Sequence, residues 1–287
     1  MINNEEKQYL DLIKKVLDQG DKQDTRNATT FSLFGEQLKF NCRDYTLPLL
    51  TTKRVFYRGV VEELLWFLNG STDANVLKEK GVSIWDKNSN REFLDSIMLN
   101  HYKEGDCGPI YGYQWRNWNG KYHNCGGLNE KGIDQLGNII HLIKTDPYSR
   151  RMYMSAWNPE QLDQMCLPPC HVSYQFYVNS NDELSVHMYQ RSADLFLGLP
   201  FNIASTATLL FILCKECNKK PGDVVISIGN IHLYENHIDA VRQQLENEMN
   251  AFPKLDINYT SIDELQYSDF TLLDYKCSKT IKAQMVA

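Results

Sequence analysis

The sequence lacks any apolar run near the roughly 20 residues that a membrane-spanning helix needs, because stretches such as 208–214 are far shorter. Its first ten residues include Glu5, Glu6 and Lys7 and contain no apolar core of a secretory signal. These absences predict a protein without a membrane span. We expect it in the cytoplasm; a nuclear or other cytosol-continuous location is compatible with the same absences.

Positive charge is not in excess. The chain has 30 Lys and Arg residues against 36 Asp and Glu residues, a net charge of −6. A general nucleic-acid coat protein depends on neutralising phosphates, so RNA binding is not expected. The eight cysteines are scattered over a long chain without a signal, and most are predicted to be reduced thiols.

No repeat, low-complexity run or Pro/Gly/Ser linker divides the 287 residues. Hydrophobic residues make up 43% and charged residues 23%, close to globular averages. We therefore expect a single domain over residues 1–287. The segment at about 117–132 is rich in Gly, Asn, Tyr and charge, and is predicted to be a surface excursion.

Hydrophobic periodicity predicts an alternation of helices and strands. Helices are expected at residues 5–19, 55–68, 73–80, 133–144, 203–217 and 234–248. Strands are expected at residues 29–40 around a glycine-containing turn, 151–157, 171–178, 184–190, 223–228, 255–259 and 270–273. Turn residues 179–182 join two of these strands into an antiparallel hairpin. Without a regular βαβ rhythm, the fold class is α+β, with a mixed or antiparallel central sheet packed by long buried helices.

Three helix ends carry capping signals. Gly20 occupies the position of a left-handed C-cap, and Gly70 closes the helix at 55–68. Ser71 or Thr72 is expected to cap the next helix.

Adjacent glutamates lie in the apolar segment VVEELLWFL, and helical phase decides which of Glu62 and Glu63 is buried. Burial raises the pKa of a carboxyl group, which prepares it for acid and base catalysis near neutral pH. A solvent-facing pair on a polar stripe is the alternative.

The segment LPPCHVSYQF contains a candidate nucleophile, Cys170, at the start of a predicted strand. His171 is a poor direct base for it, because neighbours in a strand point to opposite faces. Arg191 ends the partner strand of the same hairpin and can stabilise a thiolate. The alternative is that Cys170 is a small buried hydrophobe.

Arginines suited to phosphate binding occur at three other positions, Arg26, Arg150 and Arg151. Each alone is ordinarily a solvated charge; with Arg191 they would form an anion site if the fold gathered them. Asn202 opens a predicted helix, where it is either an N-cap or an amide that reads a planar ring.

Two further patterns bear on the search for site residues. The spacing of His232 and Tyr234 would put both on one side of a strand. His232 and His237 do not fit a zinc helix signature. Cys214 and Cys217 form a CxxC on a predicted buried helix, where core packing is favoured over a metal or redox role.

Four long motifs, taken together and in order, resemble the thymidylate synthase family. They are EGDCGPIYGYQWR, RRMYMSAWNPEQLDQMCLPPCHVSYQFYV, YQRSADLFLGLPFNIAS and GNIHLYENH. The resemblance runs from Tyr9 nearly to the C-terminus and implies a monofunctional enzyme with that family's α+β fold and mixed sheet. It implies a methyltransferase that converts dUMP to dTMP, with 5,10-methylenetetrahydrofolate supplying carbon and hydride and leaving as dihydrofolate.

The resemblance also implies roles for individual residues. Cys170 would add to C6 of the pyrimidine, Arg191 would favour the thiolate, and Glu63 would relay protons. Asn202 would read uracil, with Tyr111 and His171 in a polar network beside the base. Substrate contacts are expected from Arg26, Arg150, Arg151, Gln190, Arg191, Ser192, Asp194, Asn202, His232 and Tyr234. Cofactor contacts are expected from Lys53, Ile84, Trp85, Asp194, Leu197, Phe201 and Ala287.

Family members place the two consecutive arginines, Arg150 and Arg151, in the neighbouring subunit's phosphate site. The resemblance therefore implies a homodimer, with dUMP and reduced folate as ligands and no metal.

The sequence departs from the family pattern at three points. The loop around Arg26 reads RNATT where the family usually has glycines, so phosphate affinity is expected to change. The chain ends in Ala287 in place of a larger aliphatic residue, and Cys107 replaces a commoner aliphatic residue. We expect these changes to tune activity without abolishing it.

Two other functions fit parts of the pattern. A pyrimidine hydroxymethylase would use the same thiol and quench the methylene adduct with water; Asn202 and Trp85 speak against it. A retired paralogue that binds nucleotide or RNA is disfavoured by the intact set Cys170, Arg191, Glu63 and Asn202, and by the acidic charge balance.

Overall fold

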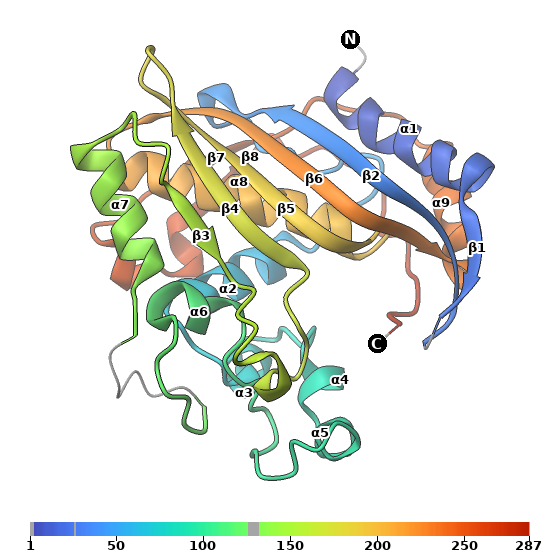
Figure 1. The fold of residues 1–287 in the computed structure, drawn as a ribbon. Coiled ribbons are helices and arrows are strands. Elements are labelled where there is room, and N and C mark those ends of the chain that lie inside the picture. Colours follow the sequence, from blue (N-terminus) through green and yellow to red (C-terminus); the bar gives the residue numbers. More distant parts are fainter. Residues whose placement is uncertain (1–2, 26, 126–131, 287) are drawn as a thin grey trace.

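The structure is a computed structural model that describes residues 3–25, 27–125 and 132–286 (Figure 1). Its centre is a six-stranded sheet in the order β1-β2-β6-β5-β4-β3. The strands are β1 (Asp21–Asp24), β2 (Thr29–Asn41), β3 (Tyr153–Ser155), β4 (His171–Val178), β5 (Glu183–Asp194) and β6 (Lys220–Tyr234). A two-stranded sheet pairs β7 (Lys254–Ile257) with β8 (Phe270–Leu273).

The central sheet is mixed. β5 and β6 pair in parallel, and the neighbouring pairs β1–β2, β2–β6, β4–β5 and β3–β4 are antiparallel. A parallel pair needs a crossover, which α8 (Gly198–Glu216) supplies. The predicted hairpin is confirmed as β4 and β5, joined by a tight turn.

The remaining helices surround this sheet. They are α1 (Asn4–Gln19), α2 (Tyr57–Leu68), α3 (Ala74–Glu79), α4 (Asp86–Ser89), α5 (Arg91–Ser96), α6 (Tyr111–Asn117), α7 (Gln135–Thr145) and α9 (Ile238–Leu245). Short 3₁₀ turns occupy Arg43–Tyr45, Leu162–Gln164, Glu235–His237, Ile262–Glu264 and Tyr267–Asp269.

The core lies between α8 and one face of the sheet (Figure 1). Within the described residues, α8 is the one helix long and apolar enough to cross a bilayer by length and composition. It is mostly buried inside the protein, so its apolar character is explained by packing against β5, β6 and α2. α2 is likewise buried on nearly every side, as its sequence predicts.

Two glycines behave differently from the prediction. Gly35 (φ 85°) lies inside β2 and does not form a turn, since Phe34 and Glu36 on either side of it pair with β6 in continuous register. Gly20 has extended backbone (φ −63°), so the predicted left-handed cap is wrong there. A side chain at Gly20 would place its Cβ 2.4 Å from the Val16 carbonyl oxygen, which explains the glycine by close approach.

Other boundaries also move. Asp73 caps α3 by accepting from the Asn75 N–H, in place of the expected Ser71 or Thr72, while Gly70 adopts the expected left-handed conformation (φ 64°). β6 continues to Tyr234 because it pairs with both β2 and β5, so the helix expected from 234 begins only at Ile238.

The surface excursion starts where α6 ends. An isolated antiparallel bridge joins Trp118 to Ile133 and brings the two ends of the segment together. Residues 126–131 of the predicted excursion lie outside the described residues.

Candidate active site

A cavity of about 480 Å³ opens where α2, α6, the ends of β4 and β5, the start of α8 and the C-terminal segment meet. Thirteen residues singled out in the sequence line it. They are Lys53, Glu63, Ile84, Trp85, Tyr111, Cys170, His171, Gln190, Ser192, Asp194, Leu197, Phe201 and Asn202.

Cys170 lies directly before β4, and the hairpin places Arg191 beside it. The Arg191 N–H donates to the Cys170 carbonyl oxygen (2.9 Å). Its guanidinium donates to the carbonyl oxygens of Pro168 (2.7 Å) and Pro169 (2.8 Å), and one nitrogen lies 4.0 Å from Cys170 Sγ. The two prolines thus orient both the thiol and the cation that faces it.

Opposing effects act on the Cys170 thiol. Burial raises its pKa, whereas the positive charge of Arg191 and a hydrogen bond with Tyr111 lower it, and the net shift is upward. The Cys170 N–H also donates to the Tyr111 hydroxyl oxygen (2.7 Å). In the ligand-free cavity the thiol form is therefore favoured at neutral pH.

Both glutamates of α2 are buried, with different partners. Glu62 forms an ion pair with Lys80 (2.7 Å). Glu63 faces the cavity and accepts from the indole N–H of Trp85 (2.8 Å). Burial raises the pKa of Glu63 to about 7, although the Trp85 bond lowers it. This carboxyl group can therefore give or take a proton near neutral pH.

Asn202 is the fifth residue of α8, which begins at Gly198, so it does not act as the N-cap. Its Oδ1 accepts from Gln190 Nε2 (2.7 Å), and its Nδ2 lies 2.8 Å from His171 Nε2. Burial lowers the pKa of His171 to about 4, so the ring is neutral at pH 7. Tyr111 packs against the same ring, with centroids 4.7 Å apart.

The β5–α8 junction supplies the polar and cationic end of the cavity. Asp194 Oδ1 accepts from the N–H groups of Phe196 (2.9 Å) and Leu197 (3.2 Å). The Lys53 amine is buried against Phe196. It donates to the Phe196 carbonyl oxygen and lies 3.5 Å from the Phe196 ring centroid. Burial lowers the pKa of Lys53 to about 7, so this amine is only partly charged at neutral pH.

His232 and Tyr234 share one side of β6, with ring centroids 5.1 Å apart, as their spacing predicts. They are not among the residues that line the cavity itself. His232 Nδ1 lies 3.0 Å from Asn230 Oδ1, and burial lowers the pKa of the ring.

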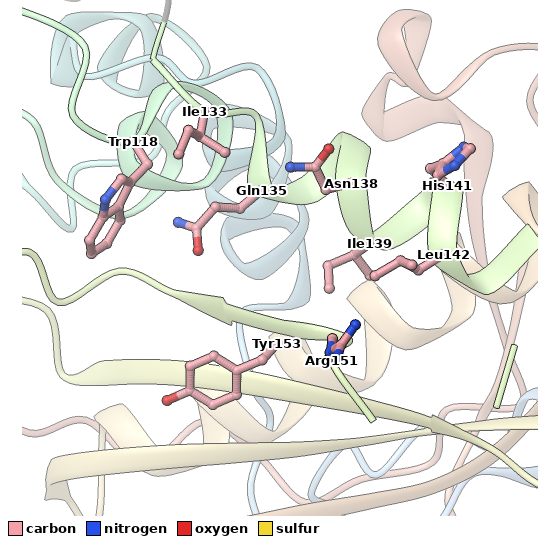
Figure 2. A pocket seen from close by; sticks show the side chains of 9 residues that line it. All are labelled: Trp118, Ile133, Gln135, Asn138, Ile139, His141, Leu142, Arg151 and Tyr153. Atoms are coloured by element: carbon pink, nitrogen blue, oxygen red, sulfur yellow. The ribbon is translucent and has the colours of Figure 1, made fainter. Parts of the chain in front are cut away.

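Arg150 and Arg151 do not lie at Cys170 within one chain. Arg150 and Arg151 are exposed in the turn before β3. Arg151 lines a separate groove of about 480 Å³ between α7 and β3, close to Ile139 and Leu142 and with Trp118 at the other end (Figure 2). Arg26 and Ala287 lie outside the described residues.

The C-terminal segment forms part of the cavity wall, although the sequence analysis predicted a contact only from Ala287. Thr280, Ile281, Met285 and Val286 line the cavity. The segment is anchored where His237 Nε2 donates to the Gln284 carbonyl oxygen (2.8 Å) and Lys87 Nζ donates to that of Met285 (2.8 Å). Apolar residues in an otherwise polar tail were the available signal. Asn88 and Leu167, also unpredicted, line the cavity too.

The donor set is unlike a metal centre. Across residues 3–25, 27–125 and 132–286, three or more His, Cys, Asp or Glu side chains do not converge as a metal ion would require. The cavity instead combines apolar walls with a few convergent polar groups, which suits an organic ligand.

Fold and cavity together define an α+β enzyme that pairs a cysteine thiol with a carboxyl group titrating near neutrality. Residues 7–287 match the family model described as Thymidylate synthase. The chain belongs to the thymidylate synthase family.

Named relatives agree. The chain is 48% identical to "Thymidylate synthase" of Saccharomyces cerevisiae, over 99% of this chain and 97% of that protein. It is 46% identical to "Thymidylate synthase" of Agaricus bisporus, over 98% and 99%. It is 51% identical to "Bifunctional dihydrofolate reductase-thymidylate synthase 2" of Arabidopsis thaliana, over 98% of this chain and 50% of that protein. The chain therefore spans about half the length of such bifunctional relatives and nearly all of the monofunctional ones.

This membership confirms the resemblance found in the motifs. It assigns the chain to the methyltransferases that convert dUMP to dTMP, with 5,10-methylenetetrahydrofolate as co-substrate.

Proposed function

We propose that residues 1–287 act as one catalytic domain in which Cys170 is the covalent nucleophile for reductive methylation of dUMP. The observation that carries this proposal is the thiol 4.0 Å from the Arg191 guanidinium, at a cavity that also contains Glu63. Addition of the thiolate to C6 makes C5 nucleophilic, which divides a difficult substitution into easier steps.

Proton movements fall to Glu63. Its pKa of about 7 suits it to donate a proton during folate activation and to assist removal of the C5 proton afterwards. Tyr111 supports Cys170 by accepting its backbone N–H, and His171 remains neutral beside them. Asn202 donates to uracil O4 and accepts from N3–H, whereas cytosine reverses both partners.

Phosphate binding is proposed for Arg191, Ser192 and Arg26, and ribose recognition for His232 and Tyr234. Gln190 is proposed to support substrate binding through Asn202, to which its Nε2 donates. The folate would lie against a polar contact at Asp194 and the apolar walls of the cavity. Those walls are Ile84, Trp85, Leu197 and Phe201. Lys53 would meet the folate glutamate through a change from its buried position, and Ala287 would help to close the site.

The active unit is proposed to be a homodimer in which Arg150 and Arg151 complete the partner's phosphate site. Their exposure and the separate groove at Arg151 support this proposal, because these guanidinium groups lack a role at their own chain's cavity. Exposed tyrosines on the sheet, Tyr153, Tyr177 and Tyr189, add an amphipathic surface suited to self-association. The cytoplasm is the proposed location.

Dihydrofolate formation tests the reaction directly. The purified chain is mixed with methylenetetrahydrofolate and either dUMP or dCMP, and absorbance is followed beside a Cys170→Ser variant. We expect signal with dUMP alone and a loss of at least about a thousandfold in the variant, because its hydroxyl is a far weaker nucleophile.

Other outcomes separate the alternatives. Consumption of the methylene donor without dihydrofolate would indicate a hydroxymethylase. Nucleotide binding without any consumption would indicate a retired binding protein. Full activity in Cys170→Ser would contradict the proposed nucleophile.

A further inference from the structure

Asn202 belongs to a buried chain of hydrogen bonds whose direction is fixed at both ends. At one end, Gln190 Nε2 donates to the backbone carbonyl oxygen of Ser192 (3.1 Å) and to Asn202 Oδ1 (2.7 Å). Because a backbone carbonyl can only accept, the NH₂ group of Gln190 must lie on this side. Asn202 must then turn its oxygen toward Gln190 and its NH₂ group the other way.

His171 receives that NH₂ group. Asn202 Nδ2 lies 2.8 Å from His171 Nε2, and an amide nitrogen only donates, so Nε2 must be the unprotonated acceptor. Burial keeps the ring neutral, with a pKa of about 4. Its single proton therefore resides on Nδ1, which lies 3.1 Å from the Tyr174 hydroxyl oxygen.

The chain continues into α8. Tyr174 accepts the Nδ1 proton, and Thr206 is the other side-chain hydrogen-bonding partner of its hydroxyl. Thr206 Oγ1 in turn donates to the Asn202 carbonyl oxygen (2.8 Å), a second backbone acceptor. Tyr174 and Thr206 are each 2% exposed, so water does not compete for these bonds.

We infer that Tyr174 and Thr206 are positioning residues that determine pyrimidine specificity, by holding His171 in the Nδ1–H tautomer and thereby locking the Asn202 amide. This inference rests on the proposed function, in which Asn202 reads the base. The locked amide offers its second N–H to uracil O4 and its second lone pair to uracil N3–H. Pairing with cytosine requires the flipped amide. The NH₂ group of Asn202 would then face the NH₂ group of Gln190, and its oxygen would face the unprotonated Nε2 of His171.

Nitrogen NMR of the ligand-free protein labelled with ¹⁵N-histidine tests the tautomer without any assay of activity. The His171 signals are assigned with His171→Gln. We expect Nδ1–H at pH 7 in the wild type and a shift toward Nε2–H in Tyr174→Phe. This variant keeps the ring that packs edge-on against Trp115, with centroids 5.3 Å apart, and loses only the acceptor. Thr206→Val should shift the population in the same direction, and Thr206→Ser should restore the wild-type spectrum.

Specificity is measured as the ratio of kcat/KM for dUMP to that for dCMP. We expect this ratio to fall about five- to tenfold in Tyr174→Phe and Thr206→Val, the effect of one misdirected hydrogen bond. Thr206→Ser should retain it. Tyr259→Phe is the matched control, since it removes a tyrosine hydroxyl that donates to the Ile212 carbonyl oxygen, farther along α8.

An Nε2–H tautomer in the wild type would overturn the inference. An unchanged dUMP-to-dCMP ratio in folded Tyr174→Phe would overturn it as well. If the wild type fails to methylate dUMP, the proposed function fails and the specificity role falls with it, while the nitrogen spectra still decide the direction of the hydrogen bonds.

Discussion

At the residue scale, neighbouring side chains of the same type have different chemistry because their partners differ. Glu62 is neutralised by Lys80 at 2.7 Å, whereas Glu63 has an indole N–H and no cation within ion-pair distance among the described residues. A buried carboxyl group without a cation holds its proton to higher pH. Burying Glu63 without a cation therefore lowers the free energy of unfolding at neutral pH and provides a proton donor at the cavity.

Glu63→Gln should stabilise the protein increasingly as pH rises. The pKa of Glu63 is raised from 4.5 to about 7 in the folded protein, so between these values the folded chain retains a proton that the unfolded chain has released. The wild-type free energy of unfolding therefore falls through this window, and the variant should become roughly 3 kcal/mol more stable than wild type above about pH 8. Activity should fall in the same variant, because glutamine cannot transfer the proton.

Urea unfolding at several pH values measures this difference. The exposed Glu248→Gln serves as control and should show no comparable rise with pH. A pH-independent difference for Glu63→Gln would show that the pKa of Glu63 is not raised in the folded protein.

At the scale of elements, the site depends on how closely α2 and α6 approach. α2 carries Glu63 and Phe67, and α6 begins with Tyr111, whose ring stacks on Phe67 with centroids 4.8 Å apart. Gly112 makes the approach possible, because a Cβ there would lie 2.3 Å from the Phe67 carbonyl oxygen. The backbone itself must move to accept any side chain.

Gly112→Ala should therefore destabilise the protein by roughly 2–4 kcal/mol and lower activity by displacing Tyr111 from Cys170. Gly81→Ala is the matched control. Gly81 has positive φ (77°), and the described residues leave open space where its Cβ would lie, so only backbone strain of about 1 kcal/mol is expected. Chemical unfolding and dihydrofolate formation are measured for both, and equal losses would contradict the importance of the helix contact.

At the scale of the whole molecule, one chain assembles the thiol, the carboxyl group and the amide but leaves Arg150 and Arg151 exposed elsewhere. The proposed homodimer would supply these guanidinium groups across the interface. An arginine pair from a partner would add bidentate phosphate contacts to the one proposed for Arg191.

Mixed dimers test this arrangement. Arg151→Ala and Cys170→Ala should each be nearly inactive alone. After subunit exchange, random assortment should restore about a quarter of wild-type activity, because half the dimers are mixed and each has one intact site. Mixing either variant with itself is the control. Failure to recover activity in confirmed mixed dimers would contradict a shared site.

Much of the fold is predictable because it depends on short-range periodicity. Alternating residues 171–190 predict β4 and β5, and the tight turn between them brings Arg191 to Cys170 without help from distant segments. The apolar surface of α2 and α8 predicts burial in the same way. Boundaries that depend on pairing with remote strands were less accurate, as with β6, which extends to Tyr234.

The sequence by itself determined the family, the α+β class, the hairpin that joins thiol to guanidinium, and the burial of a glutamate on α2. Tertiary structure alone decided that Trp85 is the partner of Glu63 and that the Lys53 amine donates to the Phe196 carbonyl oxygen. It also decided that Tyr174 contacts His171. The physical reason is the distance along the chain over which each effect acts. Periodicity and turns act over a few residues, whereas the pKa and orientation of a polar group depend on whichever distant segments exclude water from it and supply its hydrogen bonds.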